Sequence, residues 1–162
     1  KGENVMLSYW NKKEDTEKVL KDGWLYTGDI GEIDPQDGYL KITDRKKDII
    51  VSAGGDNISP AKIENQILNF PAIDQCMVYG DGKNYLVVLI VPNKEFKEEE
   101  EKITKIISEI NKNLTIVEKI KKFHIINETF SIENGLLTPT MKVKRNKVIA
   151  KYKNILEHLY KK

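Results

Sequence analysis

Cysteine and histidine are scarce in this 162-residue sequence, which contains only Cys76, His124 and His158 of these two kinds. A single cysteine cannot close an intramolecular disulfide or build a cysteine-based metal site. Two histidines so far apart in sequence do not suggest a zinc motif. We therefore expect no metal site, a fold held by its hydrophobic core, and a reducing, cytoplasmic setting.

Long apolar runs and an excess of one charge are also lacking. The longest apolar run, residues 85–91, is too short to span a bilayer, and no signal peptide is visible. The 27 basic and 25 acidic residues leave a net charge of +2, so no large basic field points to nucleic acid. The first residue is not methionine, and we expect the chain to be a piece of a longer protein.

Arginine is rare as well, because only Arg45 and Arg145 among the 27 basic residues are arginines. Arginine is favoured where a planar, bidentate donor is needed. Each of the two is therefore a candidate for a specific role, with a structural salt bridge as the alternative.

Turn and cap signals predict short elements in the first part of the chain. Ser59 and Pro60 are typical of an N-cap and a first helical residue, and a loop with proline and glycine at 35–38 is typical of a hairpin. The expected elements are a short helix over 15–20, hairpin strands over 31–34 and 39–42, a strand over 48–51, and a helix from Ser59 to Pro71.

The second part alternates between strand and helix patterns. Isoleucines at 103, 106, 107 and 110 recur at helical spacing, and the run Glu98–Glu101 before them suits the positive end of a helix. The expected elements are a second hairpin with strands over 73–79 and 85–91, this helix, a further short helix ending at Lys122, a strand over 123–126, a loop over 133–142 and a last helix bearing Val148, Tyr152, Ile155 and Leu159 on one face.

Interspersed helices and hairpin-linked strands indicate an α+β fold, with short sheets and hairpins flanked by about three helices. A domain border is expected near residues 43–47, where the first hairpin ends in a run of charges.

Two segments before residue 51 have residue types suited to binding a nucleotide. Residues 23–31 place Asp29 between glycines, where its carboxylate could accept hydrogen bonds from a vicinal diol. The alternative is a turn aspartate that caps its own backbone. Residues 43–50 gather three cations and two acids, which could bind an anionic nucleotide or could be a solvated turn.

Two further segments have residue types suited to binding phosphate or a narrow ligand. Residues 51–60 hold paired glycines before a helix N-terminus, which allows close approach of a ligand or forms a plain strand-to-helix turn. Residues 137–145 place lysines on a loop before a helix, where one could act as a movable point charge or simply begin a basic helix.

Taken in order, these four segments resemble the adenylate-forming superfamily, which includes acyl-CoA synthetases, firefly-type luciferases and the adenylation domains of peptide synthetases. Residues 23–29 are similar to its ribose-binding segment, and residues 43–64 to its hinge and the loop and helix that follow. Residues 139–145 are similar to its catalytic-lysine segment, in the form used by long-chain fatty acyl-CoA synthetases. Residues 6–10 also match, so the resemblance covers nearly the whole chain.

The resemblance implies an ATP-dependent ligase with two half-reactions. ATP and a fatty acid give an acyl-adenylate and diphosphate, and the thiol of CoA then displaces AMP. A C-terminal lid domain swings between the two steps. The resemblance further implies that residues 1–47 are the tail of the large AMP-binding domain, with the hinge at its end, and that residues 48–162 are the lid.

Individual residues match the motifs of the family. Asp29 matches the aspartate that holds the ribose hydroxyls, and Arg45 an arginine that helps bind the nucleotide. Lys47 matches the hinge residue, where the family has Asp or Lys. Lys142 matches the lysine that is essential for adenylation, and Lys144 is the competing choice for that role.

The loop after the hinge matches the family loop beside the CoA channel. Gly54, Gly55 and Asn57 are the residues implied to line that channel, where the narrow pantetheine arm must pass the backbone. The family often has a cationic residue near Asn57, which this sequence lacks there. Met141 stands where the commoner form of the lysine segment has glycine, which favours the long-chain subfamily.

The resemblance implies ATP and Mg²⁺, a fatty acid, and CoA as co-substrate, bound through a large domain that lies N-terminal to Lys1. The phosphate loop, the magnesium-binding glutamate and the acyl pocket belong to that domain, so we expect the chain alone to be inactive. Peripheral contact of the whole enzyme with a membrane is left open. Other readings are a fatty acyl-AMP ligase, an adenylation domain that loads a carrier protein, or a stand-alone, non-catalytic binding module.

Overall fold

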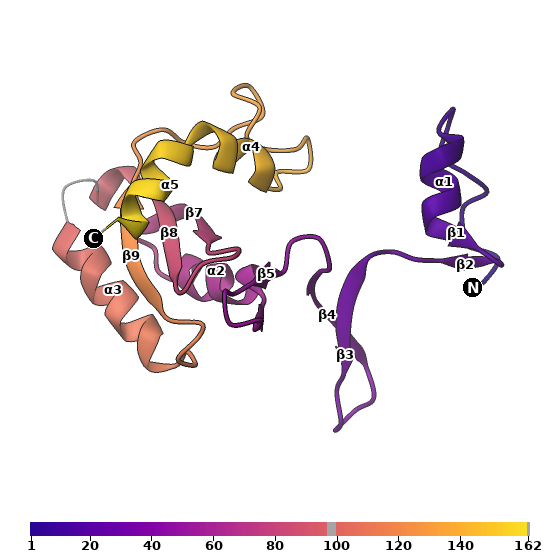
Figure 1. Ribbon diagram of the computed structural model, residues 1–162, viewed down its shortest axis with the longest axis horizontal. Helices are drawn as coiled ribbons and strands as arrows, with labels where there is room; N and C mark the ends of the chain where they lie inside the picture. Colours follow the sequence, from indigo (N-terminus) through magenta and orange to yellow (C-terminus); the bar gives the residue numbers. More distant parts are fainter. Residues whose placement is uncertain (97–99, 162) are drawn as a thin grey trace. The chain divides into compact units, whose positions relative to one another are not determined.

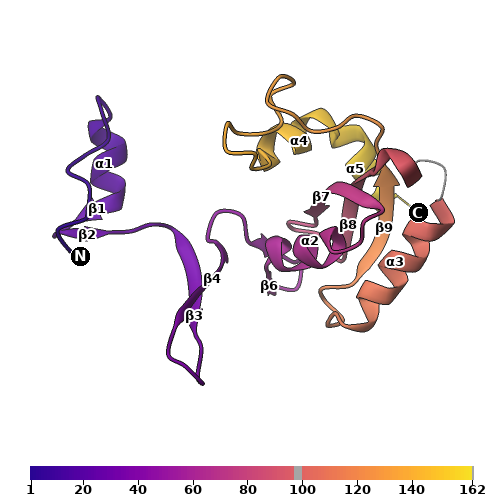
Figure 2. The same cartoon turned by 180° about the vertical axis from the view of Figure 1, so that it is seen from behind.

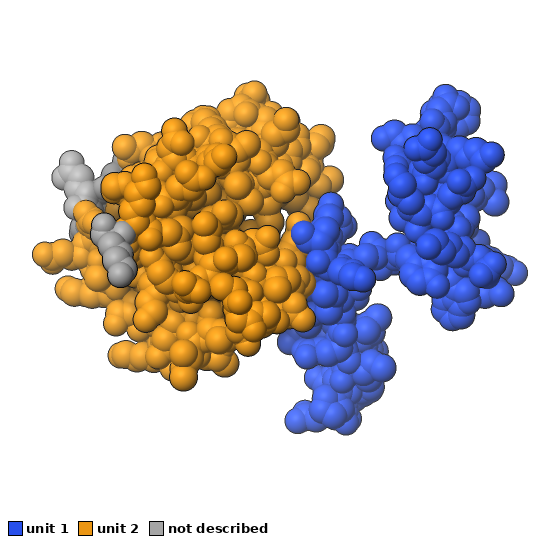
Figure 3. Space-filling model, in the orientation of Figure 1, with its two compact units in different colours: residues 1–47 blue, residues 48–162 orange. Residues whose placement is uncertain are grey.

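The computed structural model describes residues 1–96 and 100–161. It divides into two compact units, residues 1–47 and residues 48–162, which are coloured separately in Figure 3.

The first unit consists of a short helix and two hairpins, without a hydrophobic core. Its elements are α1 (Lys13–Val19), β1 (Leu20–Lys21), β2 (Trp24–Leu25), β3 (Asp29–Ile33) and β4 (Leu40–Arg45). The hairpin expected around residues 35–38 is confirmed, because β3 and β4 pair antiparallel. Large apolar side chains are exposed: 88% of Trp10 and 56% of Trp24 face solvent. These apolar side chains therefore have no packing partners within the first unit that would remove them from solvent.

The second unit is built on a three-stranded sheet in the order β7-β8-β9 (Figure 1). Strand β7 (Ile73–Tyr79) pairs antiparallel with β8 (Leu86–Pro92), which confirms the second hairpin. The central strand β8 is an unbroken apolar run and is buried throughout, as expected for a strand covered on both faces. Side chains at 86, 88 and 90 enter one core and those at 87, 89 and 91 the other.

Helices cover both faces of this sheet (Figures 1 and 2). On one side lie α2 (Pro60–Leu68) and α3 (Glu100–Lys112), whose apolar stripe Ile103, Ile106, Ile107 and Ile110 is buried as expected. On the other side, α4 (Arg145–Lys151) and α5 (Lys153–Tyr160) pack with Phe130 and Leu136. The α+β fold class predicted from the sequence is confirmed.

The N-terminus of α2 forms for the reason the sequence indicates. Ser59 has extended backbone angles and its hydroxyl accepts a hydrogen bond from the Lys62 amide at 3.3 Å, while Pro60 is the first helical residue. Just before it, β5 (Ile50–Val51) and β6 (Asn57–Ile58) pair antiparallel around the glycine-containing loop. This arrangement holds residues 52–56 as a tight loop beside the sheet.

The expected helix ending at Lys122 is wrong. Strand β9 begins at Ile120, runs to Ile125 and pairs in parallel with β8, so α3 serves as the crossover between them. Side chains bond to the backbone groups of this segment, which therefore forms a turn and a strand in place of a helix. The amide of Asn111 bonds both backbone groups of Ile120, at 2.8 and 2.9 Å. The carboxylate of Glu118 accepts bonds from both the amide and the hydroxyl of Thr115.

The expected last helix is two helices, which separate at Tyr152, where φ is −101° and ψ is 17°. Its apolar face is continuous across the break, since Val148, Tyr152 and Leu156 are all buried. Of the glutamate run at the start of α3, Glu100 and Glu101 lie in its first turn, whereas Glu98 and Glu99 lie outside the described residues.

No helix within the described ranges is both long enough and apolar enough to cross a bilayer.

Glu118 predicts a measurable pH dependence of stability in the second unit. Burial acts to raise the pKa of its carboxyl, but hydrogen bonds from Lys62 and Thr115 outweigh burial and lower the pKa below its ordinary value of 4.5. A depressed carboxyl pKa stabilises the folded state above pH 4.5, and that stabilisation is lost as the pH falls through the folded pKa. We expect Glu118→Gln to lower the free energy of unfolding by about 1 kcal/mol at pH 7.

The check is urea unfolding of wild type and Glu118→Gln between pH 6 and pH 3. The wild-type free energy of unfolding should fall more steeply with acidification, and the two curves should converge at low pH. Parallel curves would show that the Glu118 carboxylate does not contribute to the acid sensitivity.

Candidate functional site

Asp29 and Arg45 form a cross-strand pair in the first unit. They are register partners in the antiparallel β3–β4 ladder, and Arg45 Nε lies 3.4 Å from Asp29 Oδ1. The Asp29 amide donates to the Thr27 hydroxyl at 3.1 Å, and the carbonyl of Gly28 accepts from the Lys46 amide at 2.8 Å. The two candidate nucleotide-binding residues are thus brought together by strand register, although they are 16 positions apart in sequence.

The pair keeps its polar groups accessible. The side chain of Asp29 is 28% exposed and that of Arg45 is 51% exposed. A partly exposed carboxylate beside a guanidinium can accept bonds from a diol while the cation attracts phosphate. The neighbouring Asp44 is buried and accepts a bond from the Arg45 amide at 2.7 Å, which fixes the backbone at this end of β4.

The loop between β5 and β6 is held by the hydroxyl of Ser52. This hydroxyl donates to Asp56 Oδ2 at 2.8 Å and accepts from the amides of Gly54 and Asp56, each at 3.1 Å. Gly55 has a φ of 88°, a left-handed conformation that strongly favours glycine. The Ser52 side chain and a glycine at position 55 therefore preorganise the loop that contains two of the candidate CoA-channel residues.

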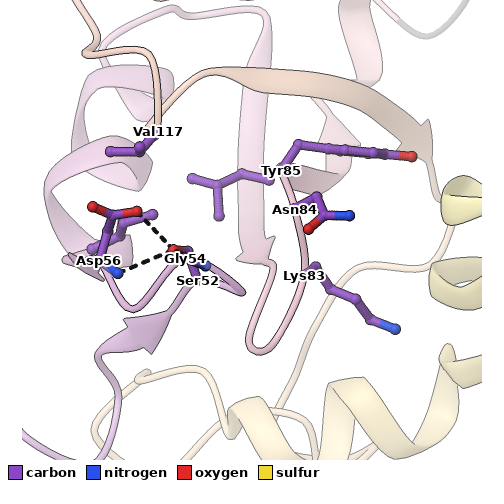
Figure 4. Close-up of a pocket in the computed structure, with 9 residues that line it drawn as sticks. Ser52, Gly54, Asp56, Lys83, Asn84, Tyr85 and Val117 are labelled. Atoms are coloured by element: carbon purple, nitrogen blue, oxygen red, sulfur yellow. Dashed lines mark hydrogen bonds between the residues drawn. The ribbon is translucent and has the colours of Figure 1, made fainter.

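A cavity of about 260 Å³ lies between this loop and the β7–β8 connection (Figure 4). Hydrogen bonds dock the two segments: the Ala53 amide donates to the Lys83 carbonyl at 2.9 Å, and the Gly82 amide to the Val51 carbonyl at 2.8 Å. The Lys83 side chain points away from Ser52, toward the ring of Tyr160, whose centre lies 5.0 Å from its ammonium group. The walls of the cavity are Ser52, Gly54, Asp56, Ile58, Lys83, Asn84, Tyr85, Leu86 and Val117.

Asn57, the third candidate channel residue, lies outside this lining. It is the first residue of β6, pairs with Val51 and is exposed. The structure therefore brings Gly54 to the cavity, whereas Gly55 and Asn57 belong to the same loop and strand without lining it.

Lys142 lies on a small hairpin between Leu137 and Val143, which form an isolated antiparallel bridge. We call residues 137–143 the lysine hairpin. Thr138 fixes the backbone of Lys142 on both sides, because its amide donates to the Lys142 carbonyl at 2.8 Å and its hydroxyl accepts from the Lys142 amide at 3.0 Å. The lysine side chain is exposed and makes no ion pair within residues 1–96 and 100–161.

Met141 adopts a φ of 61° at the tip of the lysine hairpin. This left-handed conformation costs a non-glycine residue about 1–2 kcal/mol, which gives a physical reason for glycine in the commoner form of the segment. The side chain of Met141 is 66% exposed. The competing residue Lys144 is half-buried and occupies the N-cap position of α4.

Arg145 is a partly buried structural partner. Its guanidinium is ion-paired with Glu64 of α2 and donates to the carbonyl of Val78 at 3.2 Å. The salt-bridge alternative considered for this arginine therefore describes its place in the structure. The roles of Glu64 and Thr138 were not predicted from the sequence. For Thr138 the Thr-Pro-Thr pattern before Lys142 was a usable signal, because threonine hydroxyls often bond backbone groups in turns. The sequence near Glu64 contains no comparable signal.

Lys47 is exposed and is the last residue of the first unit. Cys76 is buried, and burial raises the pKa of its thiol, so it is unsuited to act as a nucleophile. The described parts of the chain contain no group of three or more His, Cys, Asp or Glu side chains that could hold a metal ion.

Residues 47–162 match the family model described as the AMP-binding enzyme C-terminal domain, and the chain belongs to this family. The chain is 36% identical to the long-chain-fatty-acid–CoA ligase FadD15 of Mycobacterium tuberculosis, with 100% of the chain and 30% of that protein covered. It is 32% identical to the chloroplastic long-chain-fatty-acid–[acyl-carrier-protein] ligase AEE15 of Arabidopsis thaliana, with 99% of the chain and 24% of that protein covered.

A solved structure has the same fold over the whole chain. The adenylation domain of a carboxylate reductase from Mycobacterium chelonae superposes with a TM-score of 0.88 at 28% identity, covering 99% of this chain and 27% of that one. The chain thus spans less than a third of the length of each of these relatives.

Proposed function

We propose that this chain is the C-terminal part of an ATP-dependent long-chain acyl-CoA ligase. The reaction converts a fatty acid, ATP and CoA to acyl-CoA, AMP and diphosphate through an acyl-adenylate. In this proposal residues 1–47 are the tail of a large AMP-binding domain, residues 48–162 are the lid and Lys47 is the hinge. The proposal is supported by the family of the chain and by FadD15, whose name specifies a long-chain fatty acid and CoA.

The geometry of Lys142 is the observation that carries the proposal. An exposed ammonium group without an ion-pair partner in the described ranges, on a hairpin whose backbone is bonded on both sides, is preorganised to meet an anion from outside the chain. In the adenylation step the Lys142 ammonium would lie between the carboxylate of the fatty acid and the α-phosphate. It would offset the negative charge that accumulates as the carboxylate oxygen bonds to phosphorus and diphosphate leaves.

The Asp29–Arg45 pair would hold the nucleotide in both half-reactions. The Asp29 carboxylate would accept hydrogen bonds from the ribose hydroxyls, and Arg45 would orient that carboxylate and attract phosphate. The described parts of the chain contain no group of three or more His, Cys, Asp or Glu side chains that could hold a metal ion, so the ligands of Mg²⁺ would come from the large domain.

Lys47 and the glycine-containing loop would serve the change between the two steps. A hinge must absorb a large backbone rotation, and an exposed turn residue between two units is suited to that. After rotation, the loop around Gly54 and Gly55 would border the path of the pantetheine arm. A cytoplasmic setting is part of the proposal, because the one cysteine of the chain is a buried free thiol.

A second candidate function is transfer of the acyl group to a carrier protein. The observation in its favour is the similarity to AEE15, whose name specifies an acyl-carrier protein. Both acceptors present a phosphopantetheine thiol, so the lid chemistry is the same.

The rate of thioester formation by the full-length enzyme distinguishes CoA from a carrier protein as the acceptor of the acyl group. Purified enzyme with a radiolabelled C16 fatty acid, ATP and Mg²⁺ is given either CoA or a phosphopantetheinylated carrier protein. We expect at least about tenfold faster thioester formation with CoA, which corresponds to about 1.4 kcal/mol in transition-state stabilisation. Faster loading of the carrier protein would favour the second candidate. If acyl-adenylate forms but is transferred to neither acceptor, the result would favour a fatty acyl-AMP ligase.

A further inference from the structure

The outer edge of strand β7 is closed by two side chains at Val78. Strand β7 is the edge of its sheet, so its outward backbone groups need partners other than a neighbouring strand. The Val78 amide donates to Glu64 Oε1 at 2.7 Å, and the Val78 carbonyl accepts from Arg145 Nη1 at 3.2 Å. An acceptor from α2 and a donor from α4 thus satisfy both groups of one residue.

The same two side chains are bonded to each other. Arg145 Nη2 donates to Glu64 Oε2, and both side chains are mostly buried, with 19% and 14% exposed respectively. We call Glu64, Arg145 and the backbone of Val78 the clamp. The guanidinium bonds the carboxylate and the carbonyl through two nitrogens held in one plane, a geometry that the single nitrogen of a lysine ammonium does not provide.

The clamp joins the end of the lysine hairpin to α2, the helix that follows the glycine-containing loop. Arg145 is the first residue of α4 and follows Lys142 by three residues, and the intervening Lys144 amide donates to the Leu136 carbonyl at 2.8 Å at the base of the lysine hairpin. Glu64 lies on α2, the helix that follows the loop around Gly54. One ion pair therefore connects the end of the lysine hairpin to the helix behind the channel loop.

We propose that Glu64 and Arg145 are positioning residues, which hold the lysine hairpin against β7 so that Lys142 is correctly placed for adenylation. The link to adenylation rests on the proposed function, whereas the restraint on the hairpin does not. Without the clamp, Arg145 no longer anchors the C-terminal end of the hairpin, and Lys142 samples a wider range of positions. Misplacement of a catalytic group by about 1 Å can cost about 100-fold in rate.

The first test separates the half-reactions in the full-length enzyme. Arg145→Lys keeps the charge but replaces the two guanidinium nitrogens that bond Glu64 and Val78 with a single ammonium nitrogen. Glu64→Gln keeps an acceptor for the Val78 amide but turns an amide group toward Arg145. We expect each variant to lower the rate of adenylation by about 10- to 100-fold and to change thioester formation from supplied acyl-adenylate by less than about threefold.

Tyr160→Phe is the matched control for a loss of stability alone. The Tyr160 hydroxyl donates to the carbonyls of Tyr79 and Tyr85, and neither bond involves the clamp or the backbone of the lysine hairpin. This variant should lower the melting temperature while leaving both half-reactions within about twofold at 25 °C. If the clamp has only a structural role, Arg145→Lys should also lower the melting temperature and leave both half-reactions within about twofold. That result would overturn the proposal.

The second test uses residues 1–162 and needs no ligase activity. Amide hydrogen exchange at Thr138 and Lys142 reports on the hairpin, and exchange at Val88 in the buried central strand is the internal reference. Arg145→Lys should speed exchange at the two hairpin amides at least about tenfold relative to Val88, and Tyr160→Phe should leave that ratio unchanged. An unchanged ratio in Arg145→Lys would overturn the proposal, whereas absence of adenylation in the wild-type enzyme would instead refute the proposed function.

Discussion

Lys142→Ala in the full-length enzyme is expected to lower the rate of acyl-adenylate formation by about 100- to 1000-fold while sparing thioester formation from supplied acyl-adenylate. The reason is that the Lys142 ammonium meets charge that develops only in the first half-reaction, and loss of one such contact typically has an effect of this size. Because the side chain is exposed and makes no ion pair in the described ranges, its removal should not destabilise the fold. Diphosphate release and CoA consumption follow the two steps separately.

Lys144→Ala is the control for this prediction. Lys144 is two residues away and half-buried, and its side chain makes no capping hydrogen bond at the start of α4. We expect its adenylation rate to stay within about fivefold of wild type. If both half-reactions fall equally in Lys142→Ala, the lysine is structural, and a larger first-step defect in Lys144→Ala would transfer the catalytic role to that residue.

Residues 48–162 alone are expected to fold cooperatively, and residues 1–47 alone are not. All residues of the two hydrophobic clusters lie between Ile50 and Tyr160, and the first unit contributes none. A chain of this length can bury a sufficient core without staples. Residues 48–162 should therefore unfold in one transition, with a free energy of unfolding within about 1 kcal/mol of that of the whole chain.

Two substitutions make this prediction quantitative in urea unfolding of residues 1–162. Leu89→Ala removes a fully buried side chain from the central strand and should lower the free energy of unfolding by about 2–5 kcal/mol. Trp10→Ala changes a side chain that is 88% exposed and should change it by less than about 0.5 kcal/mol. A strong effect of Trp10→Ala, or a missing transition in residues 48–162, would show that the first unit is needed for folding.

Local signals were sufficient to predict much of the fold. The N-cap at Ser59, the turn between residues 79 and 86 and the isoleucine stripe of α3 each depend on neighbours within a few residues. The parallel pairing of β9 with β8 could not be predicted in the same way. It depends on the amide of Asn111 reaching Ile120 and on Glu118 bonding Thr115, which replaced the expected helix by a turn.

The candidate site shows the same division. The resemblance of four ordered segments to the adenylate-forming superfamily was enough to propose Asp29, Arg45 and Lys142, whereas the residue types of each segment alone left a structural alternative open. The ion-pair partner of Arg145 could not be predicted from the sequence, because Glu64 is 81 positions away and the two side chains meet only at the edge of β7. The role of Met141 also needed the structure, because only its φ of 61° explains why glycine is common at that position.

The products formed by the full-length enzyme test the central claim most directly. Enzyme is incubated with a long-chain fatty acid, ATP, Mg²⁺ and CoA, and nucleotides and thioesters are quantified together by mass spectrometry. An adenylate-forming acyl-CoA ligase gives AMP, diphosphate and acyl-CoA in equal amounts, each dependent on the fatty acid. Formation of ADP and phosphate, or nucleotide turnover that does not depend on the fatty acid, would contradict this account.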